Sequence, residues 1–189
     1  RIWRPAITNR HFVMAIDPAG TDIGGSEDPL CCIVSDAQTD EDVAAIYGKM
    51  SIDQGAKLIW DLYQEYNEPI VCPERNNVGL LLIDKLVNLG VKNWYYQDDA
   101  RERIGIYTSG SVSASPRIRM IMEYADEVNL GRKRTPIKEA VLEHFSFVWL
   151  DGKPQAVKGR HDDWGMCEVL LQQAKRNSFQ EIKISPHPL

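Results

Sequence analysis

The sequence predicts an α/β fold with a mixed sheet flanked by helices. Three apolar runs, at residues 11–17, 30–35 and 43–51, are joined by short polar loops, which is typical of an antiparallel meander. Residues 69–97 then have the pattern strand–helix–strand, which indicates a parallel, right-handed crossover. The order βββ-α-β-α-β, followed mainly by helices, therefore predicts a five-stranded sheet with three antiparallel strands and then parallel ones.

Local signals mark the ends of the predicted helices. Apolar side chains recur at helical spacing within residues 51–67, where either Ser51 or Asp53 can cap the start. Gly90 and Gly131 each follow an apolar periodic segment, the usual position of a glycine that ends a helix. Further signals are Pro116 at a helix start, a hairpin turn at Asp151-Gly152, and a last helix over residues 161–176.

Length and composition indicate one globular domain. The chain has 189 residues, 43% hydrophobic and 26% charged, which suffices for a core without disulfides or structural metals. No apolar run approaches the roughly 20 residues of a membrane span. Residues 1–10 are polar and begin with Arg instead of Met, so we expect a fragment of a longer protein. The four cysteines fit no zinc motif and are expected to be buried thiols in a reducing compartment.

Charge is distributed unevenly. The net charge of −5 argues against a nucleic-acid partner, but residues 11–53 hold nine acids and only one base, so the remaining residues are net positive. A mixed, solvated surface also explains this pattern. If the protein binds DNA, the candidate phosphate contacts are Arg101, Arg103, Arg117, Arg119, Arg132, Lys133, Arg134, Lys158 and Arg160.

Carboxylates occur where active-site groups gather in α/β sheets. Asp17 ends the first predicted strand, Glu74 ends the fourth, and Asp162 and Asp163 open the last helix. Adjacent carboxylates repel unless a cation joins them, and a hard cation such as Mg²⁺ prefers oxygen ligands. Two such ions can activate a water and stabilise the leaving oxygen of a phosphodiester. The acids therefore predict a metal-dependent phosphodiesterase.

Each acid alone has a simpler explanation. Asp17 precedes a Pro-Ala-Gly turn, Glu74 suits the first turn of a helix, and the Asp162-Asp163 pair suits a helix start. Their combination favours catalysis. Asp163 lies four residues before Cys167, on the apolar helix face, which favours Asp163 over Asp162 as the direct metal ligand. Asp162 is equally suited to capping the helix or supporting the ligand.

Three motifs together, AIDPAGTDIGG, VCPERNNVG and KGRHDDWGMCEVL, resemble the nuclease domain of the large terminase subunit of tailed bacteriophages. The resemblance covers residues 11 to about 176 and implies an RNase H-like fold. It implies a nuclease that cuts concatemeric viral DNA during packaging, with Mg²⁺ or Mn²⁺, two ions in all, as cofactor. The family's acids fall on Asp17, Glu74 and the Asp162-Asp163 pair, and Asn76 and Gly79 match positions that shape the turn of the second motif.

The same resemblance implies the protein's wider setting. Residues 1–10 would be the remnant of a linker to an N-terminal packaging ATPase, and residues 11–189 would form the nuclease domain. The chain has no GxxxxGK[ST] loop, so no ATP site is expected in it. The implied partners are double-stranded DNA, the portal and a small terminase subunit, in the cytoplasm of an infected bacterium.

Two other functions fit parts of the sequence. A Holliday-junction resolvase or transposase-like nuclease would share the fold and the acids, and would differ in preferring branched DNA. A non-cleaving module that binds DNA or the portal would have no reason to hold Asp17, Glu74 and Asp163 together. A zinc hydrolase is excluded, since the chain has no HExxH motif and only four scattered histidines.

Overall fold

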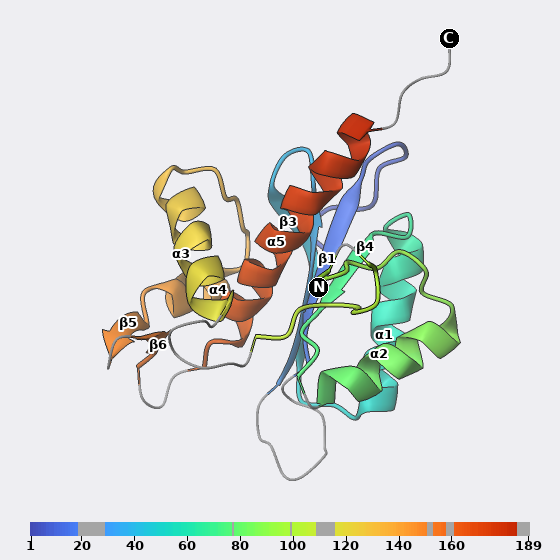
Figure 1. Cartoon of the computed structure of the whole chain (residues 1–189), viewed down its shortest axis with the longest axis horizontal. Coiled ribbons are helices and arrows are strands. Elements are labelled where there is room, and N and C mark those ends of the chain that lie inside the picture. Colours follow the sequence, from blue (N-terminus) through green and yellow to red (C-terminus); the bar gives the residue numbers. More distant parts are fainter. Residues whose placement is uncertain are drawn as a thin grey trace.

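One four-stranded sheet, in the order β3-β2-β1-β4, forms the centre of the computed structural model (Figure 1). The structure describes residues 1–18, 29–76, 78–98, 100–108, 116–150, 153–157 and 161–184. The strands are β1 (Phe12–Asp17), β2 (Leu30–Asp36), β3 (Glu41–Gly48) and β4 (Ile70–Pro73), with a separate hairpin of β5 (Phe147–Leu150) and β6 (Lys153–Ala156). The helices are α1 (Ile52–Glu65), α2 (Val78–Leu89), α3 (Pro116–Asn129), α4 (Lys138–His144) and α5 (Asp163–Ile184).

The sheet has the mixed topology that the sequence predicts. Strand β1 pairs antiparallel with β2, and β2 pairs antiparallel with β3, which confirms the meander. On its other side β1 pairs parallel with β4, with Ile16 opposite Pro73. The parallel pair places the carboxyl ends of β1 and β4 at the same edge of the sheet.

The prediction of a fifth strand at residues 91–97 is wrong, because two segments share the outer edge of β4. The first segment pairs with Val71, whose N–H donates to Asn93 O at 2.8 Å. Further along, the Ile106 N–H donates to Pro73 O at 2.9 Å instead. Gly105, with φ of +76°, allows this close approach, since a Cβ there would lie 2.2 Å from Pro73 O. Neither segment is long enough to form a full strand.

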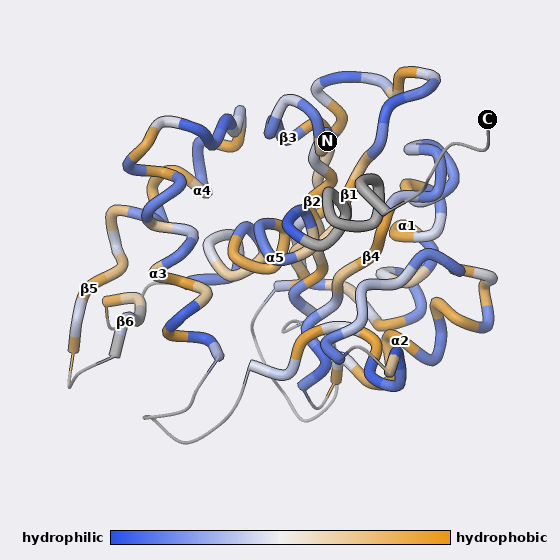
Figure 2. Tube along the Cα trace, turned by 45° about the horizontal axis from the view of Figure 1, so that its top comes forward, coloured by the Kyte–Doolittle hydropathy of each residue, from blue (hydrophilic) through white to orange (hydrophobic). Residues whose placement is uncertain are grey.

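Helices cover both faces of the sheet. Met14 and Ile16 of β1 pack in the core beneath α1 and α2, whereas Val13 and Ala15 pack in the core beneath α5. Figure 1 shows α5 lying across the sheet opposite α1 and α2, with α3, α4 and the β5–β6 hairpin beyond it. Figure 2 shows apolar residues concentrated along the strands and alternating with polar ones in α1 and α2. Continuous apolar strands are typical of a sheet buried on both faces, and the alternation is typical of helices that place one face against such a sheet.

The helix ends agree with their local signals. Ser51 caps α1 in a capping box with Gln54, which decides between the two predicted caps. Pro116 is the first residue of α3, and Gly90 and Gly131 follow α2 and α3 with φ of +104° and +66°. The predicted hairpin is present as the β5–β6 pair, although its turn at Asp151-Gly152 lies outside the described residues.

Residues 1–10 pack against the domain along the outer strand β3. The Ala45 N–H donates to Arg1 O at 2.9 Å, and the Arg1 amino group donates to Ala45 O at 2.7 Å. The Tyr66 hydroxyl in turn donates to Arg4 O at 2.5 Å. The role of this segment as an interdomain linker stays a prediction. All four cysteines are buried free thiols, and every helix in the described ranges is too short or too polar to span a bilayer.

Candidate active site

Asp17 and Glu74 are neighbours at the carboxyl edge of the sheet. The Glu74 N–H donates to Ile16 O at 2.8 Å, which continues the parallel β1–β4 pairing to the last residue of β1. Because side chains alternate along a strand, Asp17 shares the α5 face with Val13 and Ala15. Its side chain is buried, with the residue 5% exposed. A buried carboxylate beside a second carboxylate is the arrangement that a cation stabilises.

The Glu74 carboxylate is held by two side chains from different segments. Asn76 Nδ2 donates to Glu74 Oε1 at 2.9 Å and to Thr108 Oγ1 at 2.7 Å, and the Thr108 hydroxyl donates to the same Glu74 oxygen. Gly79 lies beneath this turn, where a Cβ would come within 2.0 Å of Glu74 O. Asn76 and Gly79 thus both lie against Glu74 at this turn. No local sequence signal indicated a role for Thr108.

Asp163 comes from a different element, the first turn of α5. It is 4% exposed, and the Tyr47 hydroxyl donates to its Oδ2 at 3.3 Å. One turn later the Cys167 thiol donates to Ala15 O at 3.2 Å, which fixes α5 over β1. Asp163 lies one turn before Cys167, and Asp17 lies two residues after Ala15. The first turn of α5 therefore lies over the edge of the sheet that carries Asp17 and Glu74.

Asp162 has a different environment from its neighbour. Its side chain is partly exposed and forms an ion pair with Arg117 at the start of α3. His161 lies 3.7 Å from the Asp163 carboxylate, through Nδ1, with its own side chain mostly exposed. The structure therefore gives Asp163 the buried position and Asp162 the position beside a cationic side chain.

The oxygen atoms at this site are of the kind that bind a hard divalent cation. Asp17, Glu74 and Asp163 provide carboxylate oxygens, and Asn76 Oδ1 is a further oxygen that is buried without a hydrogen-bond partner. Within the described ranges, no three His, Cys, Asp or Glu side chains converge closely enough to hold an ion. Mutual repulsion opposes such convergence until a cation joins the carboxylates.

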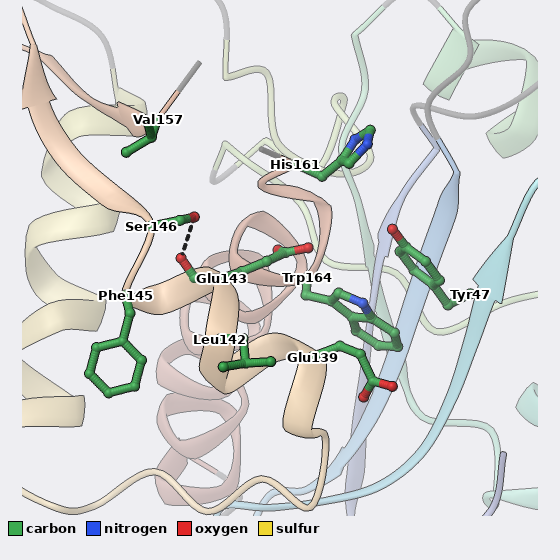
Figure 3. Close-up of a pocket in the computed structure, with 9 residues that line it drawn as sticks. All are labelled: Tyr47, Glu139, Leu142, Glu143, Phe145, Ser146, Val157, His161 and Trp164. Carbon is green, nitrogen blue, oxygen red and sulfur yellow. Dashed lines mark hydrogen bonds between the residues drawn. The ribbon is translucent and has the colours of Figure 1, made fainter. Parts of the chain in front are cut away.

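A cavity of about 750 Å³, lined by Tyr47, His161 and Trp164 among others, opens at the first turn of α5 (Figure 3). The rings of Tyr47 and Trp164 stack along it, with centroids 4.5 Å apart and planes 16° apart. Glu143 also lines it and accepts a hydrogen bond of 3.1 Å from the Gly165 N–H, within the first turn of α5. Burial raises the pKa of Glu143 to about 7, and the charges of Asp163 and Asp162 act in the same direction. Sequence reasoning missed these residues, because nothing local connects them to the acids.

The predicted phosphate contacts divide by position. Arg117 adjoins the acids through Asp162, and Arg103 lies three residues before Ile106, whose backbone pairs beside Glu74. Arg134 instead pairs with Glu41 at the opposite end of the sheet. The remaining candidates are Arg101, exposed over the Tyr96 ring; Arg119 and Arg132, exposed and paired with Glu123 and Glu127; and Lys158 and Arg160, which lie outside the described residues.

The prediction that Lys133 contacts DNA is wrong. Its side chain is 5% exposed and its Nζ lies 2.5 Å from Asp42 Oδ1 and 2.6 Å from Glu168 Oε2. The two carboxylates hold this lysine inside the protein, between β3 and α5. A charged run such as residues 132–134 is usually a solvated surface, and only the tertiary fold distinguishes its buried member.

Solved structures of known proteins share this architecture. The large terminase nuclease from thermophilic phage G20c superposes with a TM-score of 0.73 at 16% identity, over 91% of this chain and 86% of that one. The large terminase nuclease domain of Thermus phage P74-26 gives 0.68 at 15% identity, over 90% and 82% of the two chains. The nuclease domain of the P22 large terminase gives 0.55 at 17% identity, over 93% and 88%.

The chain has the fold of a large terminase nuclease domain. The RNase H-like α/β fold expected from the three motifs is thereby confirmed, with four strands in the sheet. No family model and no curated protein sequence matches the chain. At these identities the likeness to terminase nucleases shows the fold, and the roles of individual residues rest on the geometry of this site.

Proposed function

We propose that this chain is the metal-dependent endonuclease domain of a DNA-packaging terminase, and that it hydrolyses phosphodiester bonds of concatemeric phage DNA. The observation that carries the proposal is the placement of Asp17, Glu74 and Asp163 at the same edge of the sheet in a terminase-type fold. Asp162 is the fourth acid, and its ion pair with Arg117 would have to open for it to bind a metal.

In this proposal, Asp17, Glu74 and Asp163 hold divalent cations. A pair of bound ions would supply an activated water and stabilise the leaving oxygen of the phosphodiester. Asn76 and Thr108 orient Glu74 by donating to one of its oxygens, which leaves the other oxygen for a metal.

Mg²⁺ and Mn²⁺ are the ions that we propose. Carboxylate and amide oxygens suit both ions, and the candidate site offers no thiolate in an exposed position. Structures of the G20c terminase nuclease are described with bound magnesium and with bound cobalt, and a nuclease domain of the Sf6 large terminase subunit is described with manganese. These descriptions support a divalent metal at this site.

The wider setting is part of the same proposal. Double-stranded DNA would be the substrate, with residues 1–10 leading to an N-terminal packaging ATPase and with the portal and a small terminase subunit as partners in the infected cell. Of the predicted phosphate contacts within the described residues, Arg103 and Arg117 lie toward the acids, so we assign the first phosphate contacts to them.

Plasmid cleavage tests the proposal. We expect nicking and linearisation of supercoiled plasmid with Mg²⁺ or Mn²⁺ and none with EDTA. Asp17→Asn, Glu74→Gln and Asp163→Asn should each lower the rate about a hundredfold or more, since metal catalysis is worth several kcal/mol. Asp53→Asn is the matched control, because Asp53 is an exposed acid on α1, at the opposite face of the sheet.

Other outcomes would favour the other functions. Faster cleavage of a four-way junction than of linear duplex would indicate a resolvase. DNA binding by folded protein without cleavage, in the full-length protein as well as in this domain, would indicate a non-cleaving module.

A further inference from the structure

Tyr47 faces the acids from β3, the outer strand of the sheet. It lies on β3 opposite Cys31 of β2, and Cys31 lies opposite Asp17 of β1. Residues opposite one another on neighbouring strands project to the same face, so Tyr47 shares the α5 face with Asp17. This register brings its side chain to the first turn of α5.

Two contacts fix the Tyr47 side chain there. Its ring stacks on Trp164, which is 6% exposed and immobilised by the core, with centroids 4.5 Å apart. Its hydroxyl donates to Asp163 Oδ2 at 3.3 Å. The ring and the hydroxyl therefore bind two consecutive residues of α5, and only the hydroxyl touches the carboxylate (Figure 3 shows the two rings).

A carboxylate can only accept a hydrogen bond, so the hydroxyl of Tyr47 is the donor in its contact with Asp163. This hydrogen bond to Oδ2 restricts the rotation of the Asp163 carboxylate. Groups that orient metal ligands in this way contribute to metal affinity without touching the metal.

We propose that Tyr47 is a positioning residue for Asp163, and that its hydroxyl sets the affinity of the site for a divalent cation. The inference rests on the proposed function, because it takes Asp163 as a metal ligand. It adds that a tyrosine 116 residues away in sequence, on the outer strand of the sheet, controls the orientation of that ligand.

The Tyr47→Phe variant separates positioning from packing, since it keeps the stacked ring and removes the hydroxyl. Mn²⁺ binding is measured calorimetrically on the whole chain without DNA, and plasmid cleavage is then followed as a function of Mn²⁺ concentration. We expect binding about tenfold weaker in Tyr47→Phe, with thermal unfolding unchanged and the cleavage rate recovering at saturating Mn²⁺. A purely structural role would change unfolding and not the Mn²⁺ dependence.

Tyr66→Phe is the matched control, because the Tyr66 hydroxyl also donates a hydrogen bond, to Arg4 O, away from the acids. It should bind Mn²⁺ as the wild type does. Equal Mn²⁺ affinity in the wild type and Tyr47→Phe would overturn this inference and leave the proposed function intact. Absence of Mn²⁺ binding and of cleavage in the wild type would overturn both.

Discussion

Asn76 donates a 2.9 Å hydrogen bond to the carboxylate of Glu74, which precedes Asn76 by only two residues in the chain. The same amide nitrogen donates to Thr108 Oγ1 at 2.7 Å, so one side chain ties the candidate metal ligand to a distant segment. The two donated bonds also fix the orientation of the amide, and its oxygen is left as a buried acceptor. The turn after β4 is therefore built around a carboxylate.

Replacing Asn76 should weaken metal binding. Asn76→Ala removes the donor to Glu74 and leaves the carboxylate free to rotate, so we expect Mn²⁺ affinity to fall about 10- to 100-fold. Calorimetric titration with Mn²⁺ measures this. Asn88→Ala is the control, since Asn88 also donates to a carboxylate, that of Asp84 at 3.4 Å, but on the exposed side of α2. Equal losses in the two variants would rule out a specific role for Asn76.

Gly79 should tolerate no side chain. In Gly79→Ala the new Cβ would lie 2.0 Å from Glu74 O, so the backbone that carries Glu74 must shift. We expect a loss of about 3 kcal/mol in the free energy of unfolding, at the upper end of overpacking costs, together with a loss of cleavage. Chemical denaturation and the plasmid assay measure the two effects.

The control for this prediction is Gly131→Ala. No atom lies within 4 Å of a Cβ at Gly131, and only its φ of +66° opposes the substitution. This strain costs about 1 kcal/mol, and cleavage should be unaffected. If Gly79→Ala were no less stable than Gly131→Ala, the close approach of Gly79 to Glu74 O would not matter for stability.

The sequence predicted those parts of the site that local signals encode. Asp17 and Glu74 each end an apolar run, and the crossover between the two runs implies parallel neighbours, so their meeting followed from the pattern. The position of Asp163 followed from the helical period. The positions of these three acids could be predicted because strand ends and helix faces are properties of short segments.

The supporting residues could not be predicted in the same way. Thr108 is 34 residues from Glu74, and Tyr47 is 116 residues from Asp163. Such contacts depend on strand register and on the path of α5, and register is set by the whole sheet. The prediction of a fifth strand failed for a related reason. Only the tertiary fold shows that residues 93–95 and 104–106 share the edge of β4.

Lys133 should be essential for stability and not for DNA binding. Lys133→Met leaves the buried carboxylates of Asp42 and Glu168 without their cation, which should cost about 3–5 kcal/mol in the free energy of unfolding. Burial and the Asp42 charge already raise the pKa of Glu168, and the charge of Lys133 opposes this rise. Urea denaturation measures the loss.

Lys175→Met provides the comparison for Lys133. Lys175 is equally buried and pairs with Asp40, but the Asp40 side chain is 25% exposed and can be rehydrated when its partner is removed. We therefore expect a smaller loss, of about 2 kcal/mol. A loss in Lys133→Met no larger than this would contradict the view that Asp42 and Glu168 depend on Lys133.

Glu143 should make stability depend on pH. Burial raises its pKa in the folded protein from 4.5 to about 7, so folding favours the protonated carboxyl. Its stabilising contribution is complete below about pH 4.5 and is lost as the pH rises through about 7. Glu143→Gln keeps an acceptor for the Gly165 N–H and cannot ionise, so its stability relative to the wild type should increase over this range.

Urea denaturation at several pH values in EDTA measures this difference, with the carboxylates free of cations. Glu139→Gln is the control, because Glu139 lies one turn earlier on α4 and is half exposed. Its stability relative to the wild type should not change over the same range. A difference in the free energy of unfolding between Glu143→Gln and the wild type that stays constant from pH 4.5 to 8 would refute a raised pKa for Glu143.

Arg103 and Arg132 allow the proposed DNA path to be tested with a matched pair. Both side chains are exposed, 65% and 62%, and both face a carboxylate, but Arg103 lies near the Glu74 edge whereas Arg132 adjoins the opposite end of the sheet. We expect Arg103→Ala to weaken duplex binding and to reduce the slope of log affinity against log salt by about 0.9, the value for one lost phosphate contact. Arg132→Ala should leave the slope unchanged. Fluorescence anisotropy with a labelled duplex in Ca²⁺, over a range of salt concentrations, measures both slopes, and equal slopes in the two variants would mean that DNA does not approach the acids past residues 101–103.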